Sequence, residues 1–273
     1  MTVDEAIEAG LIGPNLWLYS NYTCNLTCTY CLTESAPNVP ARELSRERMQ
    51  ELAREAAALG FRGFGVTGGE PFLLTDMPGR LADLSELLPV TVLSNATAFN
   101  GDRLNGVKAL GGKDVTIQIS LDSAEPIKND AMRGPENFRK VLAAIPRLLD
   151  AGVGVRIAST VEDPEHADLS DLCELHRSLG ISDEDHVVRT IIRRGRAATE
   201  GMGETVGTTE LFPELTVTAD GAFWSPFAPT VADGRLDTDL LVTRSTRPLE
   251  HAAETLIRLV SGSGTTRYDD RFR

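Results

Sequence analysis

The chain has 273 residues, a formal net charge of −13 and only four cysteines. This length can bury a sizeable core, and one large α/β domain accounts for it. The acidic charge argues against a nucleic-acid partner, which needs a concentrated basic surface, and no apolar run is long enough to span a membrane. The acidic segment Met1–Glu5 lacks the features of a signal peptide, so we expect a cytoplasmic protein with reduced thiols.

The predicted elements alternate between strands and helices. Strands are expected to end near Ser20, Thr67, Ser94, Leu121, Thr160 and Thr190, with helices over 44–59, 77–87, 100–110, 135–150 and 165–179. Ser45 is the expected N-cap of the first of these helices, and Gly60 is its expected stop. Parallel strands joined by helices form a barrel or an open sheet. Because only six strand–helix units are visible, we predict a partial (β/α)6 TIM-like barrel.

Three of the four cysteines follow the first strand in a CxxxCxxC pattern, at Cys24, Cys28 and Cys31. Thiolates select zinc, copper(I) or iron–sulfur clusters, and the residues between these cysteines are those of a polar loop. A structural zinc site usually takes four ligands in two pairs, and no second pair is present. The pattern therefore favours a four-iron cluster with one open iron over a zinc site or three packed core thiols.

Further motifs that follow the predicted strands resemble those of a known enzyme family. Gly68-Gly69-Glu70-Pro71 follows the second strand, and Tyr30 precedes the last cysteine of the loop. Together with CxxxCxxC, this motif resembles that of radical S-adenosylmethionine (SAM) enzymes. The resemblance continues in the segments Ser94-Asn95-Ala96-Thr97, Ser120-Leu121-Asp122-Ser123, Arg133-Gly134 and Gly195-Arg196-Ala197. The last segment is similar to that of the SPASM or twitch branch, which includes peptide-maturing enzymes.

The resemblance implies a role for each of these residues. Cys24, Cys28 and Cys31 would hold a [4Fe-4S] cluster, and the amino and carboxylate groups of SAM would chelate its open iron. Gly68 and Gly69 would let the backbone approach SAM, and Glu70 would accept a hydrogen bond from the SAM ammonium group. The other implied contacts are Tyr30 near the adenine, Asn95, Ser120 and Asp122 at the ribose and carboxylate, and Arg133 at the carboxylate or in a surface ion pair. In this family, one electron from a donor such as flavodoxin or ferredoxin cleaves SAM, and the resulting radical abstracts a hydrogen atom from the substrate.

The resemblance also divides the chain. We expect an amino-terminal extension (1–13), a radical SAM partial barrel (14–198), a degenerate SPASM- or twitch-like hairpin and helix (199–260) and a flexible tail (261–273). The alternation around Asp220-Gly221 predicts the hairpin. Such extensions bind auxiliary clusters through cysteines, but no cysteine follows Cys173, so we expect a single cluster. The aromatic residues of this region line the substrate site or form a small core under the hairpin: Phe212, Phe223, Trp224 and Phe227.

Two further features have competing interpretations. Arg193, Arg194 and Arg196 form a basic patch at the barrel mouth, which either meets one anionic group or is simply a solvated strand end. Cys173 lies in a predicted helix outside the barrel, where we expect a buried structural thiol. This placement weakens the idea that Cys173 donates a hydrogen atom in an epimerisation.

Three functions stay open. The first is maturation of a ribosomally made peptide, favoured slightly by the Gly-Arg-Ala motif and the hairpin, although no leader-binding domain is visible. The second is epimerisation, dehydrogenation or rearrangement of a small metabolite, such as a sugar, aminocyclitol or nucleoside, in natural-product biosynthesis. The compact chain and the missing auxiliary cysteines favour this one. The third is a non-catalytic scaffold, which would have no need of the three loop cysteines and Glu70.

Overall fold

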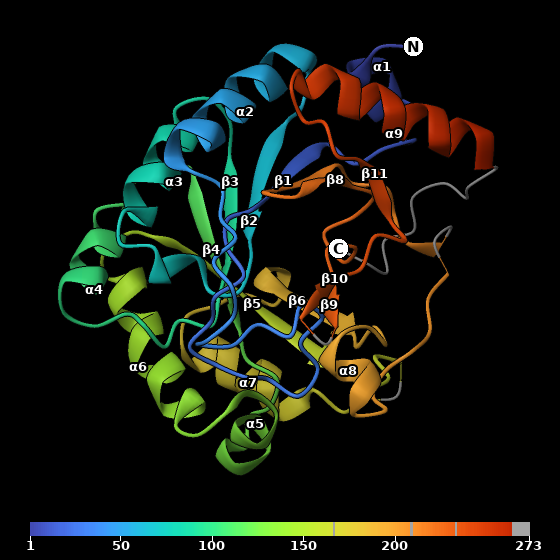
Figure 1. Cartoon of the computed structure of the whole chain (residues 1–273). Coiled ribbons are helices and arrows are strands. Elements are labelled where there is room, and N and C mark those ends of the chain that lie inside the picture. Colours follow the sequence, from blue (N-terminus) through green and yellow to red (C-terminus); the bar gives the residue numbers. More distant parts are fainter. Residues whose placement is uncertain (166, 208–209, 233, 264–273) are drawn as a thin grey trace.

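A computed structural model describes residues 1–165, 167–207, 210–232 and 234–263. Its main sheet has nine strands in the order β11-β8-β7-β1-β2-β3-β4-β5-β6. The barrel strands are parallel neighbours: β1 (Asn15–Tyr19), β2 (Gly63–Thr67), β3 (Val90–Ser94), β4 (Val115–Ser120), β5 (Gly154–Val161) and β6 (His186–Thr190). Figure 1 shows helices in an arc outside these strands, which confirms the predicted partial barrel.

The outer helices form where the apolar spacing predicts them. They are α2 (Arg46–Leu59), α3 (Met77–Ser85), α4 (Gly101–Lys108), α6 (Asn137–Leu149) and α7 (Ser170–Ser178). In α2, the Ser45 hydroxyl accepts a hydrogen bond from the Arg48 amide, and Gly60 ends the helix with a φ of 96°. A left-handed residue at this position favours glycine, so both predicted ends of the helix are confirmed.

Sequence reasoning missed three helices. Helix α1 (Val3–Glu8) begins with a capping box between Thr2 and Glu5, a signal that is readable in the sequence. Helix α5 (Pro126–Arg133) has little apolar surface to reveal it, and its Ile127 is 85% exposed. Helix α8 (Arg196–Thr199) is a single turn, too short for a periodic pattern. One-turn 3-10 helices also occur at Pro71–Leu73 and Asp183–Asp185.

The segment after the barrel extends the sheet from its β1 side. Strand β7 (Thr216–Thr218) pairs in parallel with β1, and β8 (Gly221–Phe223) returns antiparallel to it, so the predicted hairpin is confirmed. Strand β11 (Leu241–Thr243) pairs with β8, while β9 (Val231–Ala232) and β10 (Arg235–Leu236) form a separate small ribbon. Phe223 and Trp224 are buried in the main hydrophobic core and not in a separate small one.

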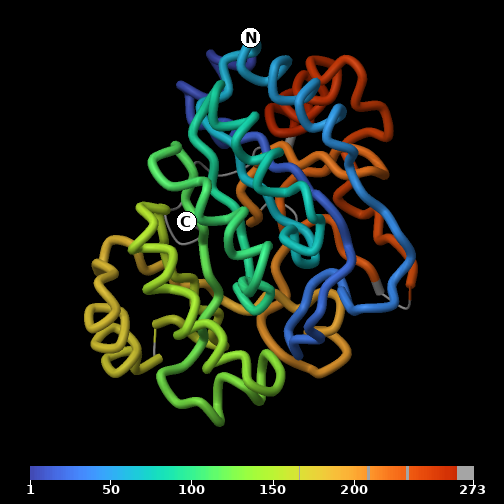
Figure 2. The backbone as a smooth tube through the Cα atoms, turned by 90° about the vertical axis from the view of Figure 1, so that its left-hand side faces the viewer, coloured from blue at the N-terminus to red at the C-terminus, as the bar shows by residue number. Residues whose placement is uncertain are grey.

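The last helix lies outside the sheet, beside the first two helices. Helix α9 (Leu249–Ser263) contacts both α1 and α2, and Figures 1 and 2 show it beside the amino-terminal segment. Residues 261–263 were expected to belong to a flexible tail, but they are the last residues of this helix. Residues 264–273 lie outside the described part. Within the described ranges, none of the helices is long and apolar enough to cross a membrane.

Candidate active site

A cavity of about 220 Å³ opens at the carboxyl ends of the barrel strands. Most of the predicted site residues line it: Cys24, Cys28, Tyr30, Cys31, Gly68, Gly69, Asn95, Ser120 and Arg133. Glu70 and Asp122 are not in this lining, and both are almost completely buried behind it. Strand ends that meet at one edge bring these residues together, as the (β/α) arrangement requires.

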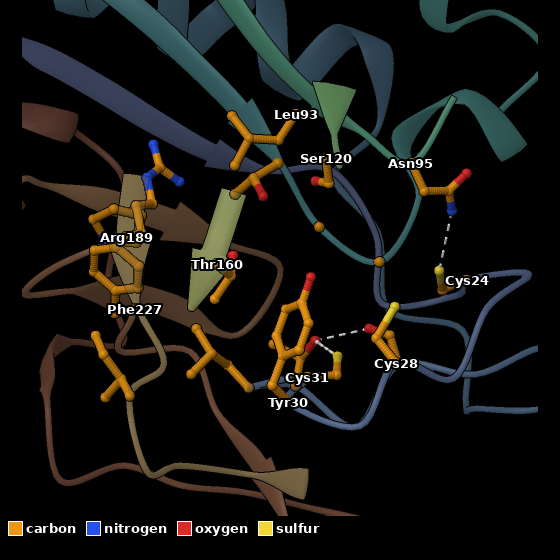
Figure 3. Close-up of a pocket in the computed structure, with 18 of the residues that line it drawn as sticks. Cys24, Cys28, Tyr30, Cys31, Leu93, Asn95, Ser120, Thr160, Arg189 and Phe227 are labelled. Atoms are coloured by element: carbon orange, nitrogen blue, oxygen red, sulfur yellow. Dashed lines mark hydrogen bonds between the residues drawn. The ribbon is translucent and has the colours of Figure 1, made fainter. Parts of the chain in front are cut away.

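The three loop cysteines are free thiols that face the same cavity (Figure 3). Burial raises the pKa of Cys24 to about 12 and also raises that of Cys28, so a metal must displace the thiol protons. Among the described residues, no group of three or more His, Cys, Asp or Glu side chains lies close enough to hold a single metal ion.

Arg196 anchors the cysteine loop from the opposite side of the barrel. Its Nη1 atom donates to the Cys28 carbonyl at 2.7 Å, and its Nη2 atom donates to the Ser35 carbonyl at 3.1 Å. Its backbone amide donates to the Cys31 carbonyl at 2.9 Å. The preceding Gly195 has a φ of 53°, and a Cβ atom there would lie 2.0 Å from the Leu32 carbonyl oxygen. The Gly-Arg pair therefore holds the loop in place.

The expected basic patch is confirmed only in part, because Arg193 is exposed to solvent whereas Arg194 and Arg196 are bound within the chain. Arg194 forms ion pairs with Asp237 and Asp239, at 3.3 and 2.7 Å, and its Nε atom donates to the Thr230 hydroxyl. Arg193 donates from Nε to the Gly203 carbonyl. All three arginines thus have hydrogen-bond partners within the chain. The sequence did not reveal this because their partners lie up to 168 positions away in the chain.

Replacing Arg196 with methionine is expected to shorten the time for which iron stays bound. The substitution removes two charge-assisted hydrogen bonds, each worth about 1.5–3 kcal/mol, so we expect loss of iron to a chelator to be at least about tenfold faster. The measurement is iron release from anaerobically reconstituted protein. Arg139→Met, on an exposed part of α6, is the matched control. Equal release rates in both variants would show that Arg196 does not hold the loop.

The two glycines after β2 allow the backbone to pack against the cysteine loop. A Cβ atom at Gly68 would lie 2.4 Å from the Asn21 carbonyl oxygen, and one at Gly69 would lie 2.3 Å from that of Thr23. The Gly69 amide donates to the Asn21 carbonyl at 2.9 Å, and the Glu70 amide donates to the Thr23 carbonyl at 2.9 Å. The glycines are therefore required by protein packing, whether or not SAM also approaches them.

Glu70 has three donors within the protein. Its carboxylate accepts from the Phe72 amide at 3.1 Å, the Ser94 hydroxyl at 2.9 Å and the Asn95 amide at 2.7 Å. Burial raises its pKa, and these hydrogen bonds offset part of that rise. The carboxylate thus joins the ends of β2 and β3, a structural role that sequence reasoning did not anticipate. Its contact with the SAM ammonium group stays a prediction.

Glu70→Ala is expected to destabilise the protein by about 3 kcal/mol, because it leaves three buried donors without an acceptor. Chemical denaturation of the metal-free protein measures this loss without involving SAM. Glu70→Gln keeps one carbonyl acceptor and should therefore lose less stability than Glu70→Ala. If Glu70→Ala unfolded at the same denaturant concentration as the unchanged protein, the bridging role would be contradicted.

Arg133, Asp122 and Tyr30 form a buried polar cluster. The Arg133 guanidinium forms an ion pair with Asp122 at 3.0 Å and donates to the Tyr30 hydroxyl, which donates to Asp122 at 2.6 Å. The Arg133 Nε atom is buried and has no partner among the described residues, although Arg133 lines the cavity. Asp122 also accepts from the Thr160 amide at 2.9 Å. Arg133 is therefore in a buried ion pair rather than a surface one.

Asn95 ties the cysteine loop to the end of β3. Its Nδ2 atom lies 3.6 Å from the Cys24 sulfur and 3.1 Å from Asn25 Oδ1. Asn25 donates in turn to Thr97 at 2.8 Å. Ser120 lines the same cavity (Figure 3). Asn95 and Ser120 both line the cavity in which a ligand would lie. Their contacts to SAM stay predictions.

The residues present fit the cluster and SAM. Three thiols from one loop supply soft ligands, and the glycine turn, the buried Arg133 Nε atom and the polar side chains of Asn95 and Ser120 surround the same cavity. These are the donor types that bind an iron–sulfur cluster and a zwitterionic amino-acid group.

Comparison with known families agrees with this geometry. A family model described as the radical SAM superfamily matches residues 18–163, which include the cysteine loop and the strands β2–β4. The chain belongs to the radical SAM superfamily. Enzymes of this family use a [4Fe-4S] cluster and SAM, and this radical SAM enzyme brings the three loop cysteines and most of the residues expected at SAM to one cavity.

Several curated proteins resemble this radical SAM enzyme. The mycofactocin maturase MftC of Mycobacterium tuberculosis is 30% identical over 221 residues, which cover 79% of this chain and 52% of the relative. A probable GTP 3′,8-cyclase of Archaeoglobus fulgidus is 31% identical over 54% of this chain and 48% of its own. The sporulation killing factor maturation protein SkfB of Bacillus subtilis is 29% identical over 55% of this chain and 36% of its own. The chain thus spans about half the length of the curated relatives it matches, or less.

Solved structures share the fold. Streptococcus suis SuiB bound to S-adenosylmethionine aligns with a TM-score of 0.60 and 16% identity over 75% of this chain and 47% of SuiB. Native anSMEcpe with bound AdoMet aligns with a TM-score of 0.63 and 15% identity over 90% of this chain and 83% of its own. At these identities the likeness concerns the fold alone.

Proposed function

We propose that this radical SAM enzyme cleaves SAM reductively at a single [4Fe-4S] cluster and abstracts a hydrogen atom from a ribosomally made peptide. The observation that carries the cluster assignment is the convergence of Cys24, Cys28 and Cys31 on the cavity that Gly69 and Arg133 also line. The only other cysteine, Cys173, lies on α7 outside the barrel, which supports one cluster within this chain.

When bound, the cluster and SAM supply a carbon radical that takes a hydrogen atom from the substrate. The residues of the chain hold these groups and exclude water. Cys24, Cys28 and Cys31 would hold the irons, and Arg196 fixes the loop that carries them. Arg133 would bind the SAM carboxylate through its unpaired Nε atom, while Asp122 and Tyr30 hold the guanidinium in place. Flavodoxin or ferredoxin is the proposed electron donor.

Two observations support a peptide as the substrate. The mycofactocin maturase and SkfB are named for maturation, and the match with the former covers 79% of this chain. The second observation is the size of the space behind the proposed cofactor site, where a further cavity of about 360 Å³ adjoins the first. We propose residues 14–198 as the catalytic barrel and residues 199–260 as a degenerate SPASM- or twitch-like extension.

The first test is anaerobic reconstitution with iron and sulfide, followed by addition of dithionite and SAM. We expect about four irons per chain and the release of 5′-deoxyadenosine, quantified by mass spectrometry. Zinc or no metal, with SAM left intact, would contradict the cluster assignment and favour a scaffold.

The second test separates a peptide from a small metabolite. Native host cells grown in heavy water provide deuterated peptide and metabolite fractions, and each is incubated with the enzyme and unlabelled SAM. Deuterium in 5′-deoxyadenosine after incubation with the peptide fraction alone supports the proposal. Deuterium after incubation with the metabolite fraction alone would favour the small-molecule alternative.

A further inference from the structure

The interior of the barrel is polar and partly empty. A cavity of about 360 Å³ lies between the strands and is lined by the side chains of Trp17, Gln118, Arg156, Arg189 and Glu214, among others. Closed (β/α) barrels instead fill this space with layers of branched apolar residues. In this chain the middle of the barrel thus contains an open cavity that is lined in part by charged side chains.

Two arginines on neighbouring strands line this interior, and their backbone positions are offset, because Arg189 pairs with Thr160 in the β5–β6 register. Arg156 on β5 makes no hydrogen bond or ion pair within the part of the chain that the structure describes. Arg189 on β6 makes one weak contact, from Nη2 to Gln118 Oε1 at 3.5 Å. The Nε atoms of both are buried and lack a partner among the described residues. Both residues are half-buried, and Asp185 and Glu214 act on them through charge but form no ion pair with them among the described residues, so the pair offers guanidinium donors that a bound anion can use.

Glu214 is the one carboxylate among the residues that line this cavity, and its charge interaction with Arg189 offsets only part of the charge of the pair. Its Oε2 atom accepts from the Trp17 indole at 3.0 Å, and no ion pair joins it to either arginine among the described residues. Burial raises the pKa of Glu214 to about 7, so it is only partly ionised at neutral pH. Burial and the charge of Arg156 lower the pKa of Arg189 to about 10, which still leaves it protonated. The cavity therefore carries net positive charge inside a protein of charge −13.

This charged cavity is continuous with the proposed cofactor site. Trp17, Arg189, Glu214 and Phe227 line both cavities. Figure 3 shows Arg189 and Phe227 on the side of the pocket opposite the cysteines, with Thr160 between them. A ligand held by the arginines would therefore extend toward the cysteine loop and place its middle portion near the SAM side of the cavity.

We propose that Arg156 and Arg189 bind a carboxylate group of the substrate peptide and so place the reacting carbon between themselves and the cysteine loop. The carboxylate belongs either to the carboxyl terminus of the peptide or to an acidic side chain. Guanidinium groups bind carboxylates through paired hydrogen bonds, and the buried, unpaired Nε atoms supply suitable donors. This assignment rests on the proposed function, because it assumes that the substrate is a peptide.

The test uses the reconstituted enzyme with SAM and three matched pools of random octapeptides. The first pool has a free carboxyl terminus and no Asp or Glu, the second has an amidated terminus and one Asp or Glu, and the third has neither carboxylate. Peptides retained by the enzyme are separated by size exclusion and counted by mass spectrometry. We expect the first or the second pool to be retained at least about tenfold more than the third. Which of the two is retained identifies the source of the carboxylate.

Variants then assign the binding group. Arg156→Gln and Arg189→Gln are expected to lower retention of the favoured pool by at least about tenfold, whereas Arg189→Lys, which keeps the charge, should lose less. Arg139→Gln, exposed on α6, is the control. Release of 5′-deoxyadenosine without substrate shows that each variant still folds and holds its cofactors. Unchanged retention in both glutamine variants would overturn the arginine assignment.

The two proposals fail in different ways. Equal retention of all three pools would overturn the carboxylate site and leave a peptide substrate in place. Retention of none of the pools would contradict the peptide function, and with it the carboxylate site. The comparison of pools on the unchanged enzyme decides the question even where a glutamine variant does not fold.

Discussion

Cys28→Ala is expected to leave the protein without an iron–sulfur cluster and without detectable release of 5′-deoxyadenosine. Cys28 is the middle ligand of the three, and the two thiols that remain cannot hold three irons of a cubane. The measurement is iron per chain after anaerobic reconstitution, which we expect to fall from about four to below about one. The loss of iron should be larger in this variant than in any variant that only removes a contact to the loop, because Cys28→Ala removes a ligand directly.

Cys173→Ala provides the matched control. Cys173 is the fourth cysteine of the chain, and its sulfur lies 3.7 Å from His186 Nδ1, on the helix side of the sheet. It is half-buried, which corrects the expectation of a buried structural thiol. We expect Cys173→Ala to keep its full iron content. Full iron content in Cys28→Ala would instead contradict the ligand assignment.

Gly69→Ala is expected to lower stability by about 3 kcal/mol, which corresponds to about 10 °C in the unfolding temperature. The new Cβ atom would lie 2.3 Å from the carbonyl oxygen of Thr23 and 2.6 Å from its carbonyl carbon. These are backbone atoms next to Cys24, so relief of the clash must displace the start of the cysteine loop. Thermal unfolding followed by circular dichroism measures the loss, and iron retention should fall with it.

Gly262→Ala is the control for this substitution. Gly262 lies in α9, and a Cβ atom there would meet no described atom within 4 Å. Alanine favours a helix by about 1 kcal/mol over glycine, so this variant should be slightly more stable. If Gly69→Ala unfolded at the same temperature as the unchanged protein, the close packing of the glycine turn against the start of the cysteine loop would be contradicted.

The sequence predicted the barrel well because its strands and helices follow simple periods. The strand ends near Thr67, Ser94 and Thr190 are those of β2, β3 and β6. The cysteines and glycines could be found because their spacing is local. Contacts between distant segments could not be found, such as those of Arg196 with the cysteine loop. The charged interior was missed for the same reason, since Gln118, Arg156 and Arg189 belong to three separate strands.

The residues that line the proposed cofactor site come from two parts of the chain, which bears on how new specificities can arise. The cysteine loop and the glycine turn lie within residues 18–163, the part that the family model matches, whereas Arg189, Glu214 and Phe227 lie beyond it. Substitutions at these later positions can change which molecule is accepted without disturbing the ligands of the proposed cluster. A designer who wishes to redirect the enzyme should therefore diversify β6 and the segment 212–227 first.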